Sequence, residues 1–426
     1  MARFSADVYQ NEFLPDGGTD VHAIVTVACT EAGVAGQGGQ GDAGEIIIVD
    51  TSGSMGHAGM EAAKQAATVA LGQIVDGTWF AVVAGNHRAY LAYPTVQSGP
   101  GMVRMNAQTR AMAGRAIASF RPDGGTAIGS WLLLTRDLFG SVPGLAQKHA
   151  VLLTDGENHN ESEVQLDAAI QRATGVFQCD CRGVGVAWKV SEVRKIAQAL
   201  LGTVDIIPHP NQMAAVFAEL MQASMARGVA EARLRVWAPQ GSQVLFVRQV
   251  APTVEELTGR GTPVNDLTRD FPTGSWADES RDYHVAVRLA ARALGQEQLA
   301  ARVQVVVRDE VQAQALVKAQ WSADELLTTR INPEVAHYTG QTELAEAIQE
   351  GLAAKAVGDE GTATLRLGRA VQLAAATGNE EATTRLRKVV EVEDEGTGTV
   401  RLKREVDRAD EMALDTASTK TTRIRS

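Results

Sequence analysis

Two short apolar runs in this chain each end in an aspartate. The first is residues 46–50, Ile-Ile-Ile-Val-Asp, and the second is residues 149–155, His-Ala-Val-Leu-Leu-Thr-Asp. Continuous apolar runs of this length are typical of strands that a parallel sheet buries on both faces. Because ligands bind beyond the carboxyl ends of such strands, we expect Asp50 and Asp155 to lie together at one edge of an α/β sheet.

Three residues with side-chain hydroxyls, which can act as metal ligands, accompany these two aspartates in the sequence. Ser52 and Ser54 follow Asp50 at alternate positions, and a Gly-Gly-Thr segment ends at Thr126. A hard divalent cation such as Mg²⁺ takes six oxygen ligands. Three hydroxyls and two carboxylates, the latter bound directly or through water, leave a coordination position for an anionic oxygen from outside. No member of the set is a nucleophile poised beside a base, so the pattern predicts a binding site.

Each of these residues also has a purely structural interpretation. Ser52, Ser54 and Thr126 can each cap a helix. Asp155 and Gly156 can form a turn. The coincidence of all five oxygen-bearing positions at expected strand ends favours the metal site.

In this order and spacing, the residues resemble the metal-ion-dependent adhesion site of a von Willebrand factor A domain. The resemblance covers residues 45–227 and implies a doubly wound, mostly parallel, Rossmann-like α/β sheet. It also implies a bound Mg²⁺, with Mn²⁺ or Ca²⁺ as alternatives, and a protein partner whose Asp or Glu completes the coordination. The metal residues carried over by position are Asp50, Ser52, Ser54, Thr126 and Asp155. The expected partner-binding rim comprises Met55, Gly125, Glu157, Asn158 and His159.

Composition narrows the classes of partner and compartment. The net charge of −11 argues against a nucleic-acid binder, which needs a basic surface. No apolar run reaches membrane-spanning length, and the N-terminus lacks the apolar core of a signal peptide, so we expect no membrane partner and a cytoplasmic location. Three cysteines fit a reducing compartment. Cys179 and Cys181 are expected to be small buried residues on one strand face.

Helical and strand patterns alternate through residues 45–227, as βα units around a parallel sheet require. The expected helices are 58–76, 104–120, 127–139, 162–174, 190–201 and 210–227. The expected strands are 45–50, 78–84, 88–93, 148–154, 176–186 and 203–207.

Residues 228–325 change to strand-like alternation and predict an antiparallel β-sandwich. Its strands are expected near 231–237, 243–250, 281–289, 301–308 and 312–321, with turn-rich pieces at Pro252, 259–263 and 272–274. Within residues 1–44, a strand at 21–29 precedes a flexible connector at 31–44. We expect that strand to pair with the sandwich, so that the A domain is inserted in it, an arrangement that resembles the hybrid domain of integrin β chains. Extension of the A-domain sheet is the alternative.

The C-terminal part divides into residues 326–392 and 393–426. The first has a helical period over 341–391 and resembles one tetratricopeptide-like hairpin, predicting a small helical bundle. In the second, Thr399 and Thr421 each precede an aliphatic residue by three positions, which resembles phosphothreonine peptides read by forkhead-associated domains. Solvated edge strands or a disordered end are the interpretation that we favour.

As a whole, the chain resembles cytoplasmic actinobacterial proteins with one A domain, which occur beside Ser/Thr kinases, phosphatases and forkhead-associated (FHA) proteins. The leading prediction is therefore a metal-dependent protein-interaction module or adaptor in such a signalling system, with no catalytic residues. An adaptor for an AAA+ (MoxR-like) ATPase is the alternative.

A metal-dependent hydrolase, or one using Ser54 with His57, is disfavoured. A haloacid-dehalogenase phosphatase needs a second Asp where Ser52 stands, and Ser54 does not lie in a Gly-x-Ser-x-Gly elbow. We therefore expect no enzyme activity.

Overall fold

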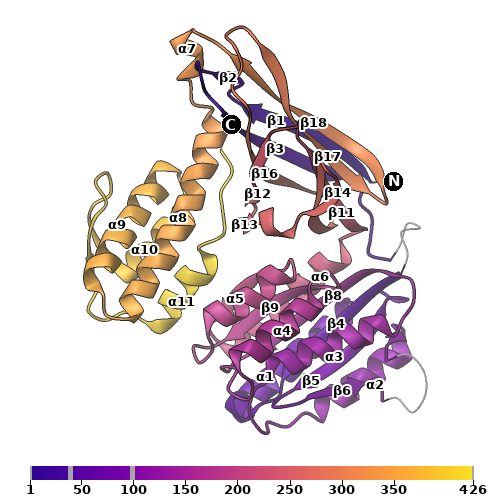
Figure 1. The fold of residues 1–426 in the computed structure, drawn as a ribbon. Helices are drawn as coiled ribbons and strands as arrows, with labels where there is room; N and C mark the ends of the chain where they lie inside the picture. Colours follow the sequence, from indigo (N-terminus) through magenta and orange to yellow (C-terminus); the bar gives the residue numbers. More distant parts are fainter. Residues whose placement is uncertain (1, 37–41, 96–100, 425–426) are drawn as a thin grey trace. The chain divides into compact units, whose positions relative to one another are not determined.

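The computed structural model describes residues 2–36, 42–95 and 101–424. Its contacts divide the chain into two compact units. The first unit comprises Ala32–Ala230 and Gly274–Ala277, and the second comprises Ala2–Glu31, Glu231–Thr273 and Asp278–Ser426. Figure 1 shows how the chain enters the second unit, builds the first and then returns. The two units are described in turn.

The first unit is built on a seven-stranded sheet with the order β10-β9-β8-β4-β5-β6, to which β7 adds by pairing with β5. Its strands are β4 (Asp42–Asp50), β5 (Trp79–Gly85), β6 (Ala89–Tyr93), β7 (Val103–Arg104), β8 (Leu145–Thr154), β9 (Gln178–Val184) and β10 (Val204–Ile207). Strands β4, β5, β8, β9 and β10 are parallel, and β6 and β7 are antiparallel additions at one side. The predicted mostly parallel sheet is confirmed.

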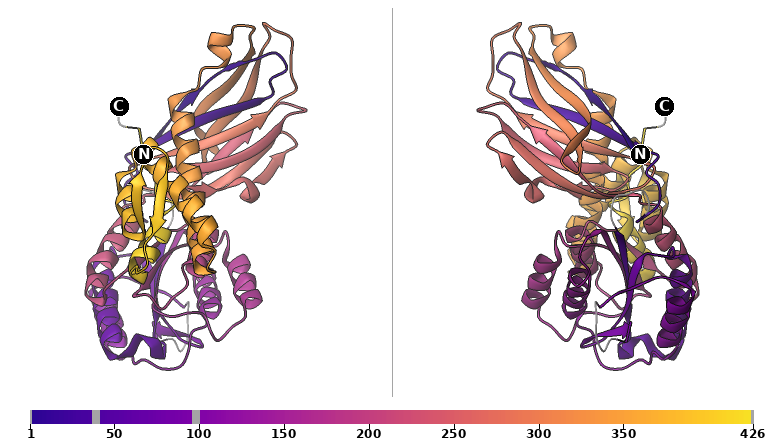
Figure 2. Two further views of the ribbon diagram at one scale, coloured as in Figure 1. Left: turned by 90° about the vertical axis from the view of Figure 1, so that its left-hand side faces the viewer. Right: turned by 90° about the vertical axis from the view of Figure 1, so that its right-hand side faces the viewer.

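Helices cover both faces of this sheet, as Figure 2 shows. They are α1 (Gly56–Gln73), α2 (Ala107–Ala118), α3 (Ile128–Gly140), α4 (Glu163–Ala173), α5 (Val190–Ala199) and α6 (Met213–Met225). Apolar residues of α1, α2 and α6 share one core with Ile47 and Val49 of β4. Ile46 and Ile48 point to the opposite face, where α3, α4 and α5 lie, and are fully buried as well. Burial on both faces explains why β4 is a continuous apolar run.

The strand order places β4 at the point where the sheet changes direction. The chain leaves β4 toward β5 on one side and later adds β8, β9 and β10 on the other. A crevice opens at the carboxyl end of such a strand because the following helices diverge to opposite faces. Asp50 is the last residue of β4, and Asp155 follows β8 directly.

The second unit contains two sheets, ordered β1-β3-β16-β12-β13 and β14-β15-β11-β17-β18-β2. Their strands are β1 (Arg3–Gln10), β2 (Phe13–Leu14), β3 (Asp20–Thr30), β11 (Val229–Trp237), β12 (Gln243–Ala251), β13 (Glu255–Glu256), β14 (Thr262–Asn265), β15 (Thr268–Trp276), β16 (Glu279–Arg288), β17 (Glu297–Val307) and β18 (Glu310–Trp321). Strand β3 pairs antiparallel with β16, so the expected pairing of segment 21–29 with the later sheet is present. It pairs on its other side with β1, which the sequence did not predict because none of its residues is buried.

Strand β15 differs from the prediction, which placed a turn at 272–274. Pro272 and Gly274 both lie inside this strand. Gly274 adopts a φ of +74°, a left-handed conformation that glycine tolerates. The turn-forming residues therefore bend the strand without reversing the chain. Strand β4 also begins earlier than predicted, at Asp42, and residues 37–41 of the expected connector lie outside the described residues.

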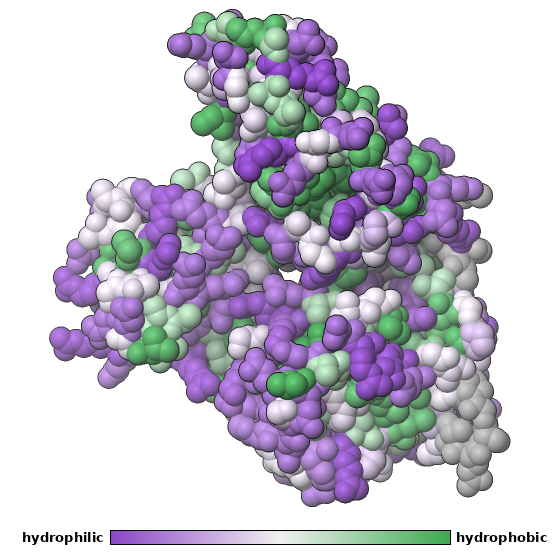
Figure 3. Space-filling view, viewed as in Figure 1, coloured by the Kyte–Doolittle hydropathy of each residue, from purple (hydrophilic) through white to green (hydrophobic). Residues whose placement is uncertain are grey.

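The remaining elements of the second unit form a helical subdomain. They are α7 (Glu325–Thr328), α8 (Pro333–Ala356), α9 (Glu360–Ala376), α10 (Glu380–Val389), β19 (Val390–Asp394), β20 (Thr399–Leu402) and α11 (Arg408–Ala417). The predicted bundle is present, and Val390, Val400 and Leu414 join its core. Residues 393–426 thus contribute the last two residues of β19, strand β20 and helix α11. The largely exposed β20 matches the solvated edge strand that the sequence favoured, whereas α11 was not predicted. Within the subdomain α8 to α11, hydrophilic residues predominate on the face that Figure 3 draws.

No helix in the described part of the chain combines the length and the apolar character that a membrane crossing requires.

Candidate metal site at the carboxyl ends of β4 and β8

The five residues predicted to bind a metal come from three loops beside the ends of β4 and β8. Asp50 ends β4, and Ser52 and Ser54 lie in the turn that leads into α1. Thr126 lies shortly before α3, and Asp155 follows β8. Their oxygens are brought together from positions up to about a hundred residues apart, as the parallel-sheet argument expects.

Asp50 is the buried anchor of the site. Its side chain is 0% exposed. One carboxylate oxygen accepts a hydrogen bond from the Ser52 amide at 2.8 Å, and the other accepts one from the Thr154 hydroxyl at 2.7 Å. Thr154 is the last residue of β8, so this bond joins the ends of the two neighbouring strands. No sequence pattern marks Thr154 as part of the site beyond its place before Asp155.

The two serines connect Asp50 to Asp155. The hydroxyl oxygens of Ser52 and Ser54 lie 2.9 Å apart. The Ser54 hydroxyl donates to Asp155 Oδ1 at 2.7 Å. Neither serine caps the following turn with its side chain. Their hydroxyls therefore face the shared space between the loops, as the metal-site interpretation requires.

Thr126 borders the same space from the third loop. A methyl group placed on Gly156 would lie 2.9 Å from the Ser54 hydroxyl oxygen and 3.3 Å from the Thr126 hydroxyl oxygen. Both hydroxyls thus adjoin one small volume, which only a glycine at position 156 leaves free. We call this volume, together with Asp50, Ser52 and Asp155 beside it, the cradle.

The charges in the cradle are not balanced by cationic side chains. Burial raises the pKa of Asp50, while hydrogen bonds from Ser52 and Thr154 oppose the rise. Burial and the nearby charge of Asp50 raise the pKa of Asp155 to about 6. In the described part of the chain, no Lys or Arg forms an ion pair with either carboxylate. One buried acid, Asp50, and one half-buried acid, Asp155, have hydroxyls beside them and no ion-paired Lys or Arg among the described residues. Such a set fits a hard divalent cation.

The described residues contain no group of three or more His, Cys, Asp or Glu side chains that is suited to a metal. The cradle is of a different kind, because hydroxyls supply three of its five oxygen-bearing side chains.

The loop after Asp155 fixes the position of Thr126. Asn160 and Thr126 exchange two hydrogen bonds: the Thr126 amide donates to Asn160 Oδ1 at 3.0 Å, and the Asn160 amide donates to the Thr126 carbonyl at 2.9 Å. Asn158 Oδ1 accepts from the Ile128 amide, and Glu161 Oε1 accepts from the Gly129 amide. These contacts satisfy amides at the start of α3, which its own N-cap residue leaves without a side-chain acceptor.

The predicted rim residues separate into buried and accessible ones. Met55 is only 4% exposed and packs in the core, so its side chain does not lie on the rim. Asn158 is engaged in capping α3. Gly125 lies against Asn160. His159 is accessible, with 72% of its side chain exposed, and Glu157 forms an ion pair with Lys189 at 3.2 Å.

The two threonines considered as phosphorylation sites lie in the second unit. Thr399 is exposed at the start of β20, and its hydroxyl contacts that of Thr397. The Thr421 hydroxyl donates to the Val250 carbonyl at 2.6 Å, so this side chain is docked against β12.

Comparisons with known proteins agree with this architecture. A family model described as the von Willebrand factor type A domain matches residues 45–206, and one described as the von Willebrand factor type A C-terminal domain matches residues 372–418. The solved structure of von Willebrand factor type A from Catenulispora acidiphila is 46% identical, with a TM-score of 0.93, and the match covers 99% of this chain and 97% of that one. The chain belongs to the von Willebrand factor type A family. Domains of this family (VWA domains) are general protein-interaction modules.

Two further relatives are more distant. The ArnB paralog VWA2 from Sulfolobus acidocaldarius shares 14% identity over 98% of both chains with a TM-score of 0.59, which shows a common fold. An uncharacterized protein of Synechocystis sp., sll0103, is 27% identical over 216 residues. The match covers 50% of this chain and 49% of that protein, so the chain spans about half the length of this relative.

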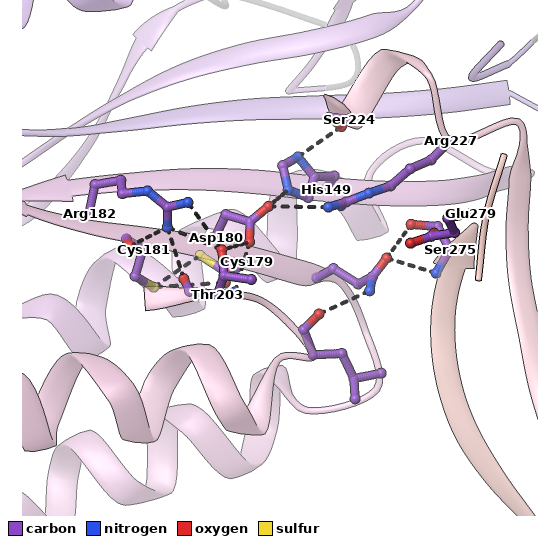
Figure 4. A network of polar contacts seen from close by, with 12 residues as sticks. His149, Cys179, Asp180, Cys181, Arg182, Thr203, Ser224, Arg227, Ser275 and Glu279 are labelled. Carbon is purple, nitrogen blue, oxygen red and sulfur yellow. Dashed lines mark hydrogen bonds and ion pairs between the residues drawn. The ribbon is translucent and has the colours of Figure 1, made fainter. Parts of the chain in front are cut away.

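A second charged cluster of the VWA domain lies toward the amino ends of the same strands and was not predicted (Figure 4). His149 of β8 contacts Glu45 of β4 through Nδ1 at 2.6 Å and Asp180 of β9 through Nε2 at 2.9 Å. Arg227 lies 3.5 Å from Asp180, and Ser224 of α6 donates to Glu45 at 2.9 Å. The side chains of Glu45, His149 and Asp180 are at most 3% exposed.

The His149 ring is an imidazolium in this setting. A neutral imidazole donates at one nitrogen only, whereas both nitrogens of His149 face carboxylates. Burial lowers the pKa of His149, but the charge of Glu45 and the hydrogen bonds that the ring donates to both carboxylates outweigh it and raise the pKa to about 9. Ser224, His149 and Asp180 superficially resemble a hydrolytic triad. The imidazolium cannot take a proton from Ser224, so the cluster lacks the base that such chemistry needs.

Replacing Gly125 tests the loop contacts around Thr126. A methyl group at Gly125→Ala would lie 1.8 Å from Asn160 Oδ1, so Asn160 must move and leave the Thr126 amide without its acceptor. We expect the free energy of unfolding to fall by about 1–3 kcal/mol and amide exchange at Thr126 to accelerate. The control is Gly114→Ala in α2, where nothing lies within 4 Å. It should leave stability unchanged or raise it by up to about 1 kcal/mol. Equal stability of both variants would contradict the assigned contact.

The buried cluster predicts a pH dependence of stability. In the unfolded chain His149 has a pKa near 6.5, and in the folded chain about 9. The folded state therefore holds an extra proton between these values, and its stabilisation is complete below pH 6.5 and lost as the pH rises through 9. The loss is about 3 kcal/mol. Urea unfolding of the wild type should show this slope, and His149→Gln should lack it.

His149→Gln should also be less stable by about 3–5 kcal/mol at neutral pH, because buried Glu45 loses its cationic partner and Asp180 keeps only Arg227 at 3.5 Å. The exposed His209→Gln is the matched control and should behave as the wild type. An identical pH slope in wild type and His149→Gln would show that the ring does not carry the proton.

Proposed function

We propose that the VWA domain is a metal-dependent protein-interaction module. Its cradle would hold Mg²⁺, with Mn²⁺ or Ca²⁺ as alternatives, and a carboxylate of a protein partner would complete the coordination. The observation that carries the proposal is that the Ser54 hydroxyl contacts Ser52 and Asp155 and adjoins, with the Thr126 hydroxyl, the volume beside Gly156. The five side chains are Asp50, Ser52, Ser54, Thr126 and Asp155.

The negative charges of the two carboxylates in the cradle favour the binding of a cation. Asp50 and Asp155 each have an upward-shifted pKa because burial penalises their charges, and each is near the other. A divalent cation would remove this penalty and take the hydroxyl oxygens as neutral ligands. With at most two carboxylates bound, the ion would keep net positive charge and attract an anionic oxygen. The exposed His159 and the Glu157–Lys189 pair would then meet the partner at the rim.

Binding accounts for the geometry around Ser54 better than catalysis does. The Ser54 hydroxyl contacts Ser52 and Asp155, and its proton is directed toward a carboxylate that also belongs to the cradle. A serine nucleophile would need a general base, such as an imidazole or a lysine amine, to accept this proton. The classes of partner implied by the family resemblance, an FHA-domain protein, a Ser/Thr kinase or an AAA+ ATPase, differ in identity and share the need for an accessible Asp or Glu.

Metal binding should appear as thermal stabilisation. An ion that binds only the folded state adds about 2.7 kcal/mol at a concentration one hundred times its Kd. We expect Mg²⁺ or Mn²⁺ to raise the Tm of the wild type and EDTA to reverse the effect. Asp50→Asn keeps the shape of the side chain and removes its charge, so it should fold and lose at least tenfold in metal affinity by titration calorimetry. Asp137→Ala, whose side chain is 62% exposed on α3, is the control. Unchanged affinity in Asp50→Asn would exclude this cradle as the metal site.

Partner binding should depend on the same ion. In a pull-down from the native cell extract, proteins retained in Mg²⁺ should be released by EDTA, and Asp50→Asn should not retain them in either buffer. Asp137→Ala should retain the same proteins as the wild type. Mass spectrometry then identifies the released proteins, and substitution of their exposed Asp and Glu residues should abolish retention. A partner that binds equally well in EDTA would contradict the proposed mode of binding.

A further inference from the structure

Two histidines on neighbouring strands of the second unit direct ring nitrogens at each other. His22 lies on β3 and His284 on β16. The distance between His22 Nδ1 and His284 Nε2 is 3.1 Å. The ring centroids are 5.3 Å apart, and the ring planes are tilted by 60°. Neither residue belongs to the cradle described above, and neither was singled out by the sequence analysis.

The sheet register creates this pair. His22 is directly opposite Ala286 and His284 is directly opposite Ile24, so the two histidines are diagonal neighbours on one face. Phe246 of β12 presents its ring to His284 in a T-shaped contact with the centroids 4.8 Å apart. The aromatic ring restricts the movement of His284, which is only 3% exposed. His22 is partly exposed and leaves the pair open to solvent on one side.

Both rings are neutral near pH 7. Burial lowers the pKa of His284 to about 3, with further contributions from His22 and Arg248. Burial also lowers the pKa of His22, although the charge of Asp20 opposes this. The charged side chains nearby are paired: Arg248 with Glu256 at 3.0 Å, and Arg288 with Asp20 at 2.7 Å. Each neutral imidazole therefore has one nitrogen lone pair that can bind a metal ion. The charges of the neighbouring Arg and acidic side chains largely cancel.

The nitrogen separation matches that of two ligands on one metal ion. With metal–nitrogen bonds of 2.0–2.1 Å, neighbouring nitrogens lie about 2.9 Å apart in an octahedral site and about 3.4 Å apart in a tetrahedral one. The observed 3.1 Å lies between these values. We propose that His22 and His284 form a second metal site, selective for a borderline transition cation such as Ni²⁺, Zn²⁺ or Cu²⁺, with water completing the coordination.

The donor atoms distinguish this pair from the oxygen-lined cradle. Imidazole nitrogens suit Ni²⁺, Cu²⁺ and Zn²⁺, whereas hydroxyl and carboxylate oxygens suit Mg²⁺ and Ca²⁺. Metal binding needs the proton of each ring on the nitrogen that points away from its partner, whereas a direct hydrogen bond needs one proton between the rings. The ion replaces that hydrogen bond, and because each neutral ring keeps one proton, binding at neutral pH releases none. The proposal is independent of the function proposed for the VWA domain.

The test uses the full chain without an affinity tag, in excess Mg²⁺ so that the oxygen-lined cradle is occupied. Ni²⁺ is titrated by calorimetry into the wild type and into His22→Ala, which changes a partly exposed side chain. We expect one equivalent of Ni²⁺ for the wild type and loss of that equivalent, or at least a tenfold weaker affinity, in His22→Ala. His209→Ala, which removes an exposed histidine elsewhere, and Asp50→Asn should both bind as the wild type does.

Electron paramagnetic resonance of added Cu²⁺ supplies a second readout. The wild type should show two coordinated imidazole nitrogens, and His22→Ala and His284→Gln should each show fewer. Circular dichroism establishes which variants fold. If the buried His284→Gln variant does not fold, His22→Ala alone tests the proposal. Failure of the wild type to take up one equivalent of Ni²⁺, or equal uptake by the wild type and His22→Ala, would overturn the proposal and leave a plain hydrogen bond between the rings.

Discussion

The first unit places two carboxylates, Asp50 and Asp155, at the ends of adjacent parallel strands, and no Lys or Arg of residues 2–36, 42–95 and 101–424 forms an ion pair with them. Parallel strands that point the same way bring their carboxyl ends to one edge, and the helices that follow leave toward opposite faces. The loops there can turn hydroxyls toward the acids, as Ser52 and Ser54 do. Gly156 keeps the shared volume free. The cradle therefore costs electrostatic energy that a bound cation would recover.

Toward the amino ends of the same strands, by contrast, buried acids are neutralised by cationic side chains. There Glu45 and Asp180 are buried with a cationic ring, His149, and with Arg227, so the charges are balanced within the protein. Burial raises the pKa of Asp50, whereas the pKa of Asp180 lies well below its ordinary value because His149 and Arg227 outweigh its burial. The negative charges at the amino ends of β4 and β8 are thus balanced by side chains alone. At the other end, no Lys or Arg among the described residues forms an ion pair with Asp50 or Asp155.

The loop that follows Asp155 links the cradle to the helices around it. It supplies Asp155 itself, and its Asn160 holds Thr126 through two hydrogen bonds. Asn158 and Glu161 cap the start of α3. The sequence predicts Asn158 on the accessible rim and indicates no role for Asn160. Neither role has a local signature, because the amides that they satisfy lie about thirty residues earlier.

The sequence by itself determined the βα order of the first unit, the strand ends and the residue types of the cradle. Continuous burial on both faces requires apolar runs such as 46–49, and those runs are visible in one dimension. It also indicated that segment 21–29 pairs with strands more than two hundred residues later. Only the tertiary structure decided which polar residues meet. Strand register sets His149 between Glu45 and Asp180, and His22 beside His284, and register depends on long-range pairing that no local pattern encodes.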